Sequence, residues 1–85
     1  MNYAIDWTVD ALNELAAVWL AASDQLAVTN AAHRLELALE RHPFAIGLPR
    51  NSSVNRTAVD LPLGIDYEII EDDKRVRVLR VWSII

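Results

Sequence analysis

The chain has 85 residues, no cysteine and a formal net charge of −4, from twelve acidic and eight basic residues. This length predicts one domain, which we expect to span residues 1–85. The lack of cysteine excludes disulfides, thiol nucleophiles and cysteine-bound zinc, and the acidic balance argues against unassisted binding to nucleic acid. No apolar run approaches the roughly 20 residues of a membrane-spanning helix, so we expect a cytoplasmic protein without a membrane contact.

The expected element order is one strand, two helices and three further strands. The first strand is Tyr3–Thr8, where apolar and polar residues alternate as in a strand with one buried face. The side chains expected to face the helices are Tyr3, Ile5 and Trp7.

Two helices follow with almost no loop between them, which predicts an αα-hairpin. Helical periodicity covers Asp10–Ala22 and Asp24–His42. Thr8 and the pair Ser23-Asp24 are suited to cap the two starts, and Pro43 ends the second helix. The apolar stripes expected to face the core are Leu12, Leu15, Ala16, Trp19 and Leu20 in the first helix, and Val28, Ala31, Ala32, Leu35, Ala38 and Leu39 in the second.

The second half of the chain predicts a long loop and then a meander of three strands. The loop is Pro43–Val54, which is rich in proline, glycine and polar residues. The expected strands are residues 55–61, 65–70 and 75–84, joined by a turn at 62–64 and an acidic hairpin at 71–74. This order predicts an α+β fold, βααβββ, with a two-helix hairpin packed on one face of a mainly antiparallel four-stranded sheet.

The sheet face away from the helices is the first candidate site. Alternation in the last three strands directs one set of apolar side chains toward the helices: Val59, Leu61, Ile65, Tyr67, Ile69, Val76 and Val78. The opposite phase puts charged residues on the open face: Arg56, Arg75, Arg77, Asp60, Asp66 and Glu68. Either these charges form cross-strand ion pairs that keep the face soluble, or the arginines form a cluster that binds phosphate.

Beyond Val78 the alternation breaks, which predicts either a β-bulge or burial on both faces. The apolar residues left on or beyond the outward register are expected to contact a partner protein or a second copy of the chain. They are Leu79, Val81, Ile84 and Ile85.

Other chemistry has little support in the sequence. His33 and His42 are far apart on the second helix, so neither is expected to act as a general base. The chain has neither a glycine-rich phosphate loop nor a metal-ligand spacing, so we expect no cofactor and no metal. The tryptophans lie on apolar registers and are expected in the core: Trp7, Trp19 and Trp82.

Over nearly its whole length the chain resembles the RelE/ParE toxin superfamily of type II toxin–antitoxin modules, often labelled plasmid-stabilisation proteins. The resemblance is carried by Tyr3–Thr8 opening into Ala11–Leu15, by Trp19-Leu20, Ala27–Ala32, Leu35, Leu39 and Pro43, and by Pro62-Leu63-Gly64, Tyr67-Glu68 and Arg75–Trp82. It implies a toxin that either cleaves mRNA on the ribosome or poisons DNA gyrase, and a cognate antitoxin that wraps the toxin with an extended or helical segment.

In the nuclease branch, the resemblance implies basic residues on the sheet that stabilise the phosphate while a ribose 2′-hydroxyl attacks. Arginines that could do so here are Arg56, Arg75, Arg77 and Arg80. Residues Ile65-Asp66 stand where a catalytic arginine is implied. Three interpretations follow: a toxin-like component that binds its antitoxin, an active ribosome-dependent endonuclease, or a noncatalytic interaction module or gyrase binder.

Overall fold

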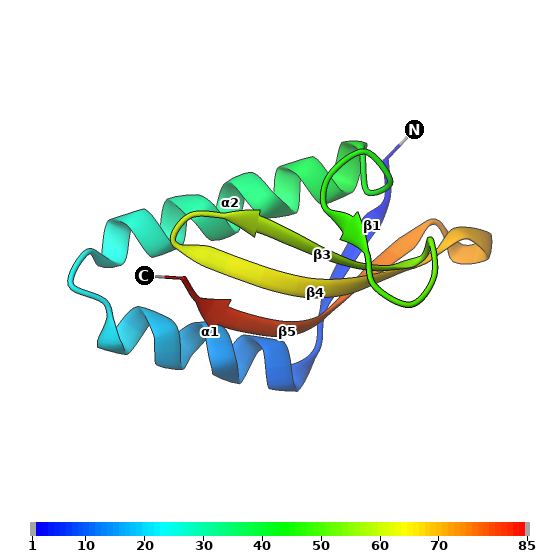
Figure 1. Ribbon diagram of the computed structural model, residues 1–85. Helices are drawn as coiled ribbons and strands as arrows, with labels where there is room; N and C mark the ends of the chain where they lie inside the picture. Colours follow the sequence, from blue (N-terminus) through cyan, green and yellow to red (C-terminus); the bar gives the residue numbers. More distant parts are fainter. Residues whose placement is uncertain (1, 85) are drawn as a thin grey trace.

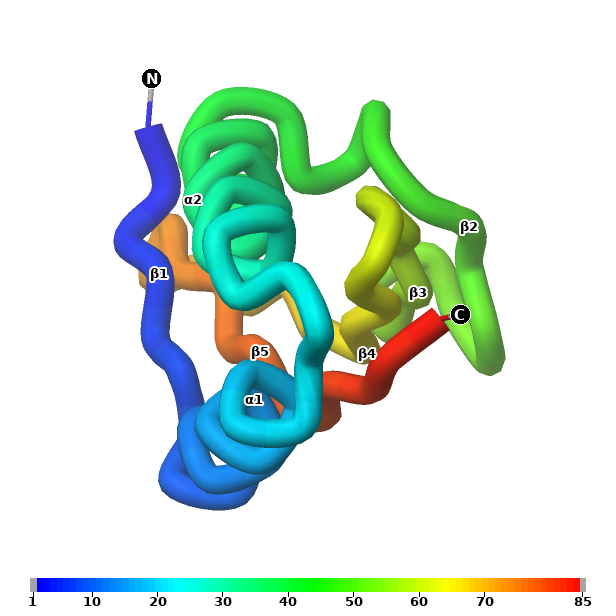
Figure 2. The backbone as a smooth tube through the Cα atoms, turned by 90° about the vertical axis from the view of Figure 1, so that its left-hand side faces the viewer, coloured from blue at the N-terminus to red at the C-terminus, as the bar shows by residue number. Residues whose placement is uncertain are grey.

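The computed structural model describes residues 2–84, in which two helices pack on one face of a five-stranded sheet (Figure 1). The strand order is β1-β5-β4-β3-β2, with β1 parallel to β5 and all other neighbours antiparallel. Figure 2 views the molecule along the helices, with β1 and the helices at the left and β2, β3 and β4 at the right. In chain order the elements are β1 (Ala4–Trp7), α1 (Val9–Ala21), α2 (Gln25–Arg41), β2 (Leu48–Pro49), β3 (Asn55–Asp60), β4 (Leu63–Ile70), a 3-10 turn at Glu71–Asp73, and β5 (Arg75–Ser83).

The predicted α+β class and element order are confirmed, but the sheet has five strands instead of four. The additional strand, β2, lies inside the predicted loop and pairs antiparallel with β3, Leu48 opposite Thr57. Two residues are too few for alternation to be recognised, so the sequence did not indicate this strand. Pro49, which has no N–H to donate, stands at the outer edge of the sheet, where proline is tolerated.

Both helices begin at the predicted caps. Thr8 Oγ1 accepts a hydrogen bond from the Ala11 N–H at 3.1 Å and donates to the Val78 carbonyl oxygen at 2.9 Å, so this cap also fixes α1 to β5. Asp24 Oδ1 accepts from the Ala27 N–H at 3.0 Å. Local capping chemistry therefore determines where the hairpin starts and turns.

The core lies between the sheet and the helical hairpin, and the predicted stripe of α2 supplies much of it. Predictions for α1 were wrong at four positions, because Leu12, Trp19 and Leu20 are 50%, 39% and 73% exposed and Ala16 is exposed too. Apolar residues occupy nearly every side of α1, so periodicity did not reveal which side faces the sheet. The buried side carries the small residue Ala11. The principal core residues are Ala11, Val28, Ala31, Leu35, Leu39, Leu63, Ile65, Tyr67, Ile69, Val76, Val78 and Val81.

The phase predicted for β3 is reversed in the structure. Arg56 and Ala58 are 8% and 3% exposed on the helix side, whereas Val59 is 55% exposed. Asp60 also points toward the helices, where its carboxylate accepts two hydrogen bonds from Arg34 of α2 at 2.8 and 2.9 Å. The residue after the strand, Leu61, is 64% exposed instead of buried. The predicted phases of β4 and of the first half of β5 are confirmed.

The break in alternation after Val78 is a β-bulge. Tyr67 lies opposite Val78 and Asp66 lies opposite Arg80, which leaves Leu79 without a partner in β4. The bulge changes the phase of β5, so Val81 is buried in the core and not outward as predicted. The expected apolar carboxyl-terminal surface therefore loses one member. Leu79 and Ile84 are half-buried, and Ile85 lies outside the described residues.

Within residues 2–84, neither helix has the length and apolar character needed to cross a membrane.

Candidate functional site

The four arginines predicted to contact phosphate do not form a cluster. Arg56 is buried beneath the Pro43–Val54 loop and does not lie on the open face, the sheet face away from the helices. Its guanidinium donates to the carbonyl oxygens of Ser53 at 3.1 Å and Gly47 at 3.2 Å. Two further acceptors, at 3.0 and 3.4 Å, are the carbonyl oxygens of Phe44 and Ile46. Arg56 therefore holds a loop and is unavailable to a ligand.

Tyr67 completes the attachment of that loop. Its hydroxyl lies 2.8 Å from the carbonyl oxygens of both Pro43 and Ile46, to which it can donate. Burial raises the pKa of Tyr67, and the nearby Arg56 opposes that rise. The neutral hydroxyl is the form that can donate, so burial and hydrogen bonding agree. We conclude that this polar cluster is structural.

Arg77 lies on the open face as predicted, but two carboxylates flank it. Its guanidinium is 3.1 Å from Glu68 on β4 and 3.9 Å from Asp6 on β1. Arg50, which sequence reasoning did not single out, lies 3.5 Å from Asp66. Thr57 also donates to that carboxylate at 2.6 Å. These contacts set three carboxylates against the guanidinium groups of Arg50 and Arg77, both of which are already paired.

The other two predicted arginines lie apart from Arg77's ion pairs. Arg80 Nε contacts Glu14 of α1 at 2.9 Å, and Arg75 is exposed at the start of β5. Among the described residues, Arg75 makes no ion pair. One unpaired arginine gives no converging set of donors for a phosphate. Neither histidine lies on the sheet, since both belong to α2 or its end, and residues 2–84 contain no group of three side chains suited to a metal ion.

Glu14 joins α1 to the bulged part of β5. Its carboxylate accepts hydrogen bonds from the Val81 N–H and from Arg80 Nε, both at 2.9 Å. The Val81 N–H, and next the Arg80 side chain, hold the pKa of Glu14 below its ordinary value of 4.5, although partial burial acts in the opposite direction. This carboxylate covers a stretch of β5 that extends past the end of β1.

The Glu14 contacts predict a specific pH dependence. A lowered folded-state pKa contributes stability above the unfolded value, and this contribution is lost as the pH falls below about 4.5. Glu14→Gln should therefore lower the urea midpoint at neutral pH. Below a pH of about 4.5, the urea midpoint of this variant should fall less steeply than that of wild type. Asn13→Ala, at an exposed position beside Glu14 on α1, removes no titratable group and is the control that should keep the wild-type slope. Equal slopes for wild type and Glu14→Gln would show that Glu14 does not contribute to the acid dependence.

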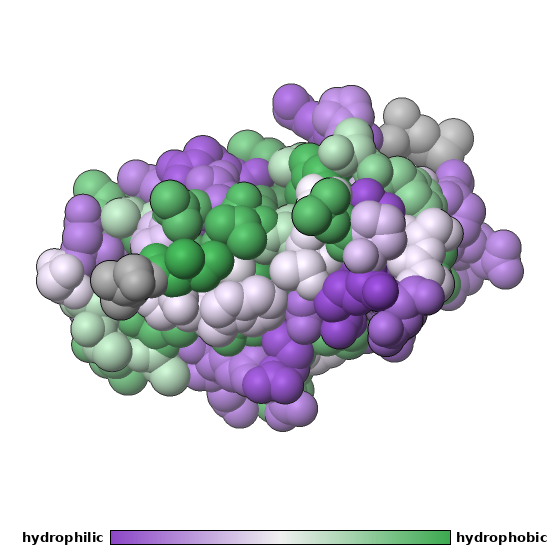
Figure 3. Space-filling model, in the orientation of Figure 1, coloured by the Kyte–Doolittle hydropathy of each residue, from purple (hydrophilic) through white to green (hydrophobic). Residues whose placement is uncertain are grey.

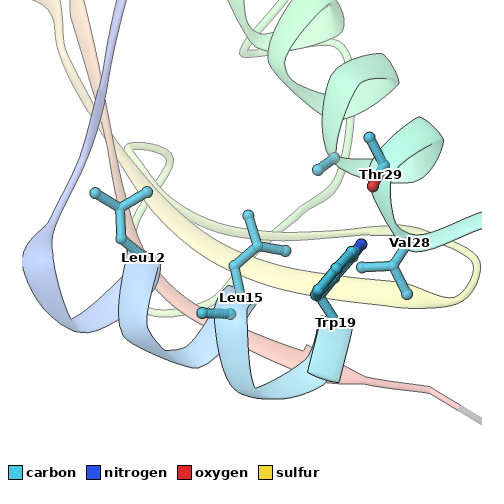
Figure 4. Close-up of a pocket in the computed structure, with 7 residues that line it drawn as sticks. Leu12, Leu15, Trp19, Val28 and Thr29 are labelled. Carbon is cyan, nitrogen blue, oxygen red and sulfur yellow. The ribbon is translucent and has the colours of Figure 1, made fainter. Parts of the chain in front are cut away.

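A second candidate site is the helix groove, an apolar hollow of about 360 Å³ between α1 and α2. Figure 4 shows Leu12, Leu15 and Trp19 projecting from α1 toward Val28 and Thr29 of α2. Leu12 and Trp19 are 50% and 39% exposed, so the groove is open to solvent. Its full lining is Leu12, Leu15, Ala16, Trp19, Val28, Thr29 and Ala32.

Apolar surface continues around the end of the molecule onto part of the open face. A second hollow, of about 310 Å³, lies between the α1–α2 turn and the end of β5 and includes Val28, Leu61 and Ile84. Figure 3 shows the apolar area at the left of the open face and polar surface over much of the remainder. The Trp82 ring covers Gly64 there, since a Cβ on Gly64 would lie 2.5 Å from the ring. Trp82 was expected in the core, but its side chain is half-buried on the surface of the sheet.

No protein-family model matches the chain, and no curated protein matches it in sequence. The toxin–antitoxin complex RelBE2 from Mycobacterium tuberculosis matches with a TM-score of 0.77 and 19% identity over 98% of this chain and 99% of that one. The chromosomal ParDE system from P. aeruginosa matches with a TM-score of 0.74 and 16% identity over 98% and 97% of the two chains. The chain has the RelE/ParE toxin fold.

The RelE/ParE fold confirms, at the level of architecture, the resemblance inferred from the sequence. The intact E. coli RelBE toxin–antitoxin complex also matches, with a TM-score of 0.68 and 18% identity over 98% of each chain. Identities this low establish a shared fold, and activity has to be judged from the side chains of this chain. Those side chains leave the helix groove open and pair the charges of the open face.

Proposed function

We propose that this protein is a toxin-like component of a type II toxin–antitoxin module and that it binds its antitoxin through the helix groove. The surface of α1 carries the proposal. Val9, Leu12 and Leu20 are 73%, 50% and 73% exposed, and Glu14, one of only two charged residues on the helix, is bonded to β5. A helix that is apolar on nearly all sides is normally covered by other protein.

The solved structures of the same fold support this proposal by analogy. The RelBE2 and E. coli RelBE structures are toxin–antitoxin complexes, and an E. coli RelE variant was solved with a peptide of its antitoxin RelB. An antitoxin segment that buries the exposed side of α1 would remove Leu12 and Trp19 from water. Burial of apolar surface stabilises a complex by about 25 cal/mol per Å² before the entropy lost on association is subtracted.

Binding is tested with the product of the neighbouring reading frame, co-expressed with this chain. Leu12→Glu places a charge in the helix groove and should weaken the purified complex by at least about tenfold. Leu48→Glu is the matched control, because Leu48 is 74% exposed on β2, outside both hollows. Equal affinities for the two variants, measured by isothermal titration calorimetry, would exclude the groove as the binding site.

Cleavage of free RNA is not expected. A phosphate approaching the open face meets the carboxylates Asp6, Asp66 and Glu68, and the guanidinium of Arg77 is already paired. Electrostatic attraction and a proton-transfer pair are therefore both lacking on the described part of this face. Incubation of single-stranded RNA with wild type and Arg77→Ala at low salt should give no cleavage by either protein. Cleavage by wild type that is lost in Arg77→Ala would contradict this, and cleavage only on programmed ribosomes would favour the endonuclease alternative.

A further inference from the structure

One end of the helix groove lies near β1, and two carboxylates of α2 lie beyond that end. Ala32 lines the groove, and Glu36 and Glu40 follow it one and two helical turns later on adjoining sides of the helix. Trp7 Nε1 donates to Glu36 at 2.6 Å, and the Tyr3 N–H donates to the backbone oxygen of Glu40 at 2.8 Å. These bonds place both residues beside β1, where the apolar lining of the groove gives way to polar residues.

Glu36 and Glu40 differ from the other half-buried carboxylates of the described chain because no cation lies beside them. Each of the other five is within 4.0 Å of a guanidinium group: Asp6 and Glu68 with Arg77, Glu14 with Arg80, Asp60 with Arg34, and Asp66 with Arg50. Glu36 and Glu40, one turn apart, also repel each other.

The arginines of α2 itself cannot relieve this repulsion. Arg34 is bonded to Asp60 of β3, and Arg41 makes no ion pair among residues 2–84. At about 100° per residue, both arginines project from the opposite flank of α2 to Glu36 and Glu40. Within residues 2–84, the two carboxylates therefore leave a site for a positive charge that a partner can supply.

We infer that the occupant of the helix groove is an amphipathic helix of the partner that carries lysine or arginine on one flank, next to its apolar stripe, and pairs with Glu36 and Glu40. The inference rests on the proposed function, because it specifies the partner for the same groove. The two walls of the groove differ toward β1: the α1 wall stays apolar as far as Leu12, whereas along α2 the lining residues Thr29 and Ala32 are followed by Glu36 and Glu40. An occupant that turns its apolar stripe to the groove and its basic flank to α2 where Glu36 and Glu40 follow the groove satisfies both walls and fixes its own rotation about its axis.

The test selects the occupant without assuming its sequence. A displayed library of helical peptides has leucine at positions i, i+3, i+4 and i+7, with lysine, glutamate, glutamine or serine randomised on both flanks. Peptides are selected for binding to the wild-type protein, and clones that also bind Leu12→Glu are removed. The remaining peptides depend on the groove. These clones should be enriched in lysine on a single flank and depleted of glutamate there.

Selected peptides are then titrated against charge variants while tryptophan fluorescence or heat is recorded. Glu36→Gln/Glu40→Gln should weaken binding by about tenfold or more, with the difference shrinking at high salt. Asp72→Asn/Asp73→Asn is the matched control, since it removes the same charge from the exposed 3-10 turn, and it should leave the affinity within about twofold.

The outcomes separate this inference from the proposed function. Groove-dependent peptides without lysine enrichment, or with equal affinity for wild type and Glu36→Gln/Glu40→Gln, would overturn the basic flank and leave groove binding intact. An equal loss in Asp72→Asn/Asp73→Asn would show attraction by net charge alone and would also overturn it. Failure to recover any groove-dependent peptide would contradict both the groove as a docking site and the inference that depends on it.

Discussion

Arg56→Met is expected to destabilise the protein by about 3 kcal/mol or more, a large share of the roughly 5–15 kcal/mol that stabilises a small domain. The buried guanidinium donates to the carbonyl oxygens of Phe44, Ile46, Gly47 and Ser53. Methionine is similar in length but donates nothing, so the carbonyl oxygens of Phe44, Gly47 and Ser53 would lose this donor and that of Ile46 would keep only the Tyr67 hydroxyl. Hydrogen bonds to a charged group contribute about 1.5–3 kcal/mol each, and an unsatisfied buried acceptor adds a further penalty.

Urea denaturation and limited proteolysis of residues 43–54 measure this effect. The loop should be cleaved faster in Arg56→Met than in wild type, because the guanidinium holds it against β3 and β4 together with the Tyr67 hydroxyl. Arg75→Met is the control, since Arg75 is exposed and makes no ion pair in the described chain; its stability should stay within about 0.5 kcal/mol of wild type. If both variants match wild type in stability and proteolysis, Arg56 does not hold the loop.

Arg56 also shows why the open face could be predicted only in part. Alternation in β4 was reliable because Ile65, Tyr67 and Ile69 share one side and leave Asp66 and Glu68 on the other. In β3 the apolar residue Val59 indicated the wrong phase. The inward side of β3 is stabilised by polar contacts, which hydropathy does not register.

Two sets of polar contacts outside the strand stabilise the actual phase of β3. Arg56 meets carbonyl oxygens of a loop that precedes the strand, and Asp60 meets Arg34 on α2. Alternation within the strand cannot register either contact, since Arg34 is 26 residues from Asp60 and the loop carbonyls that Arg56 meets reach back 12 residues to Phe44. The candidate phosphate site required Arg56 to point outward, and alternation within the strand could not test this. Arg77 lies in a regular part of β5, so its place on the open face was predicted correctly.

The helical hairpin presents the opposite difficulty. In α2 one apolar stripe stands out against polar residues, so Val28, Leu35 and Leu39 were predicted correctly as core. In α1 almost every residue is apolar, and several stripes fit equally well. The uncertainty about which stripe of α1 is buried is itself informative. A helix in a small domain buries only one side against its own sheet, so an entirely apolar helix has apolar residues left over. The remaining apolar side of α1, including Leu12 and Trp19, is surface that the fold does not use.

Trp19→Ala should therefore affect partner binding far more than stability. The sequence placed Trp19 in the core, where its loss would remove about 3–5 kcal/mol of stability. In the structure Trp19 is 39% exposed and lines the helix groove, so we expect a loss of only about 1 kcal/mol in urea denaturation. A tryptophan at the centre of an interface commonly contributes about 2–4 kcal/mol to affinity, which corresponds to a loss of roughly thirtyfold or more in the complex with the antitoxin.

Two matched variants make that comparison decisive. Leu39→Ala removes a fully buried side chain and should lower stability by about 2–5 kcal/mol, so it calibrates a core position. Leu20→Ala changes the neighbouring residue of α1, which is 73% exposed and outside the groove lining, and should leave stability unchanged and reduce affinity less than Trp19→Ala. A stability loss in Trp19→Ala as large as that in Leu39→Ala would mean that Trp19 is a core residue in solution. Wild-type stability together with wild-type affinity would instead place the antitoxin elsewhere on the molecule.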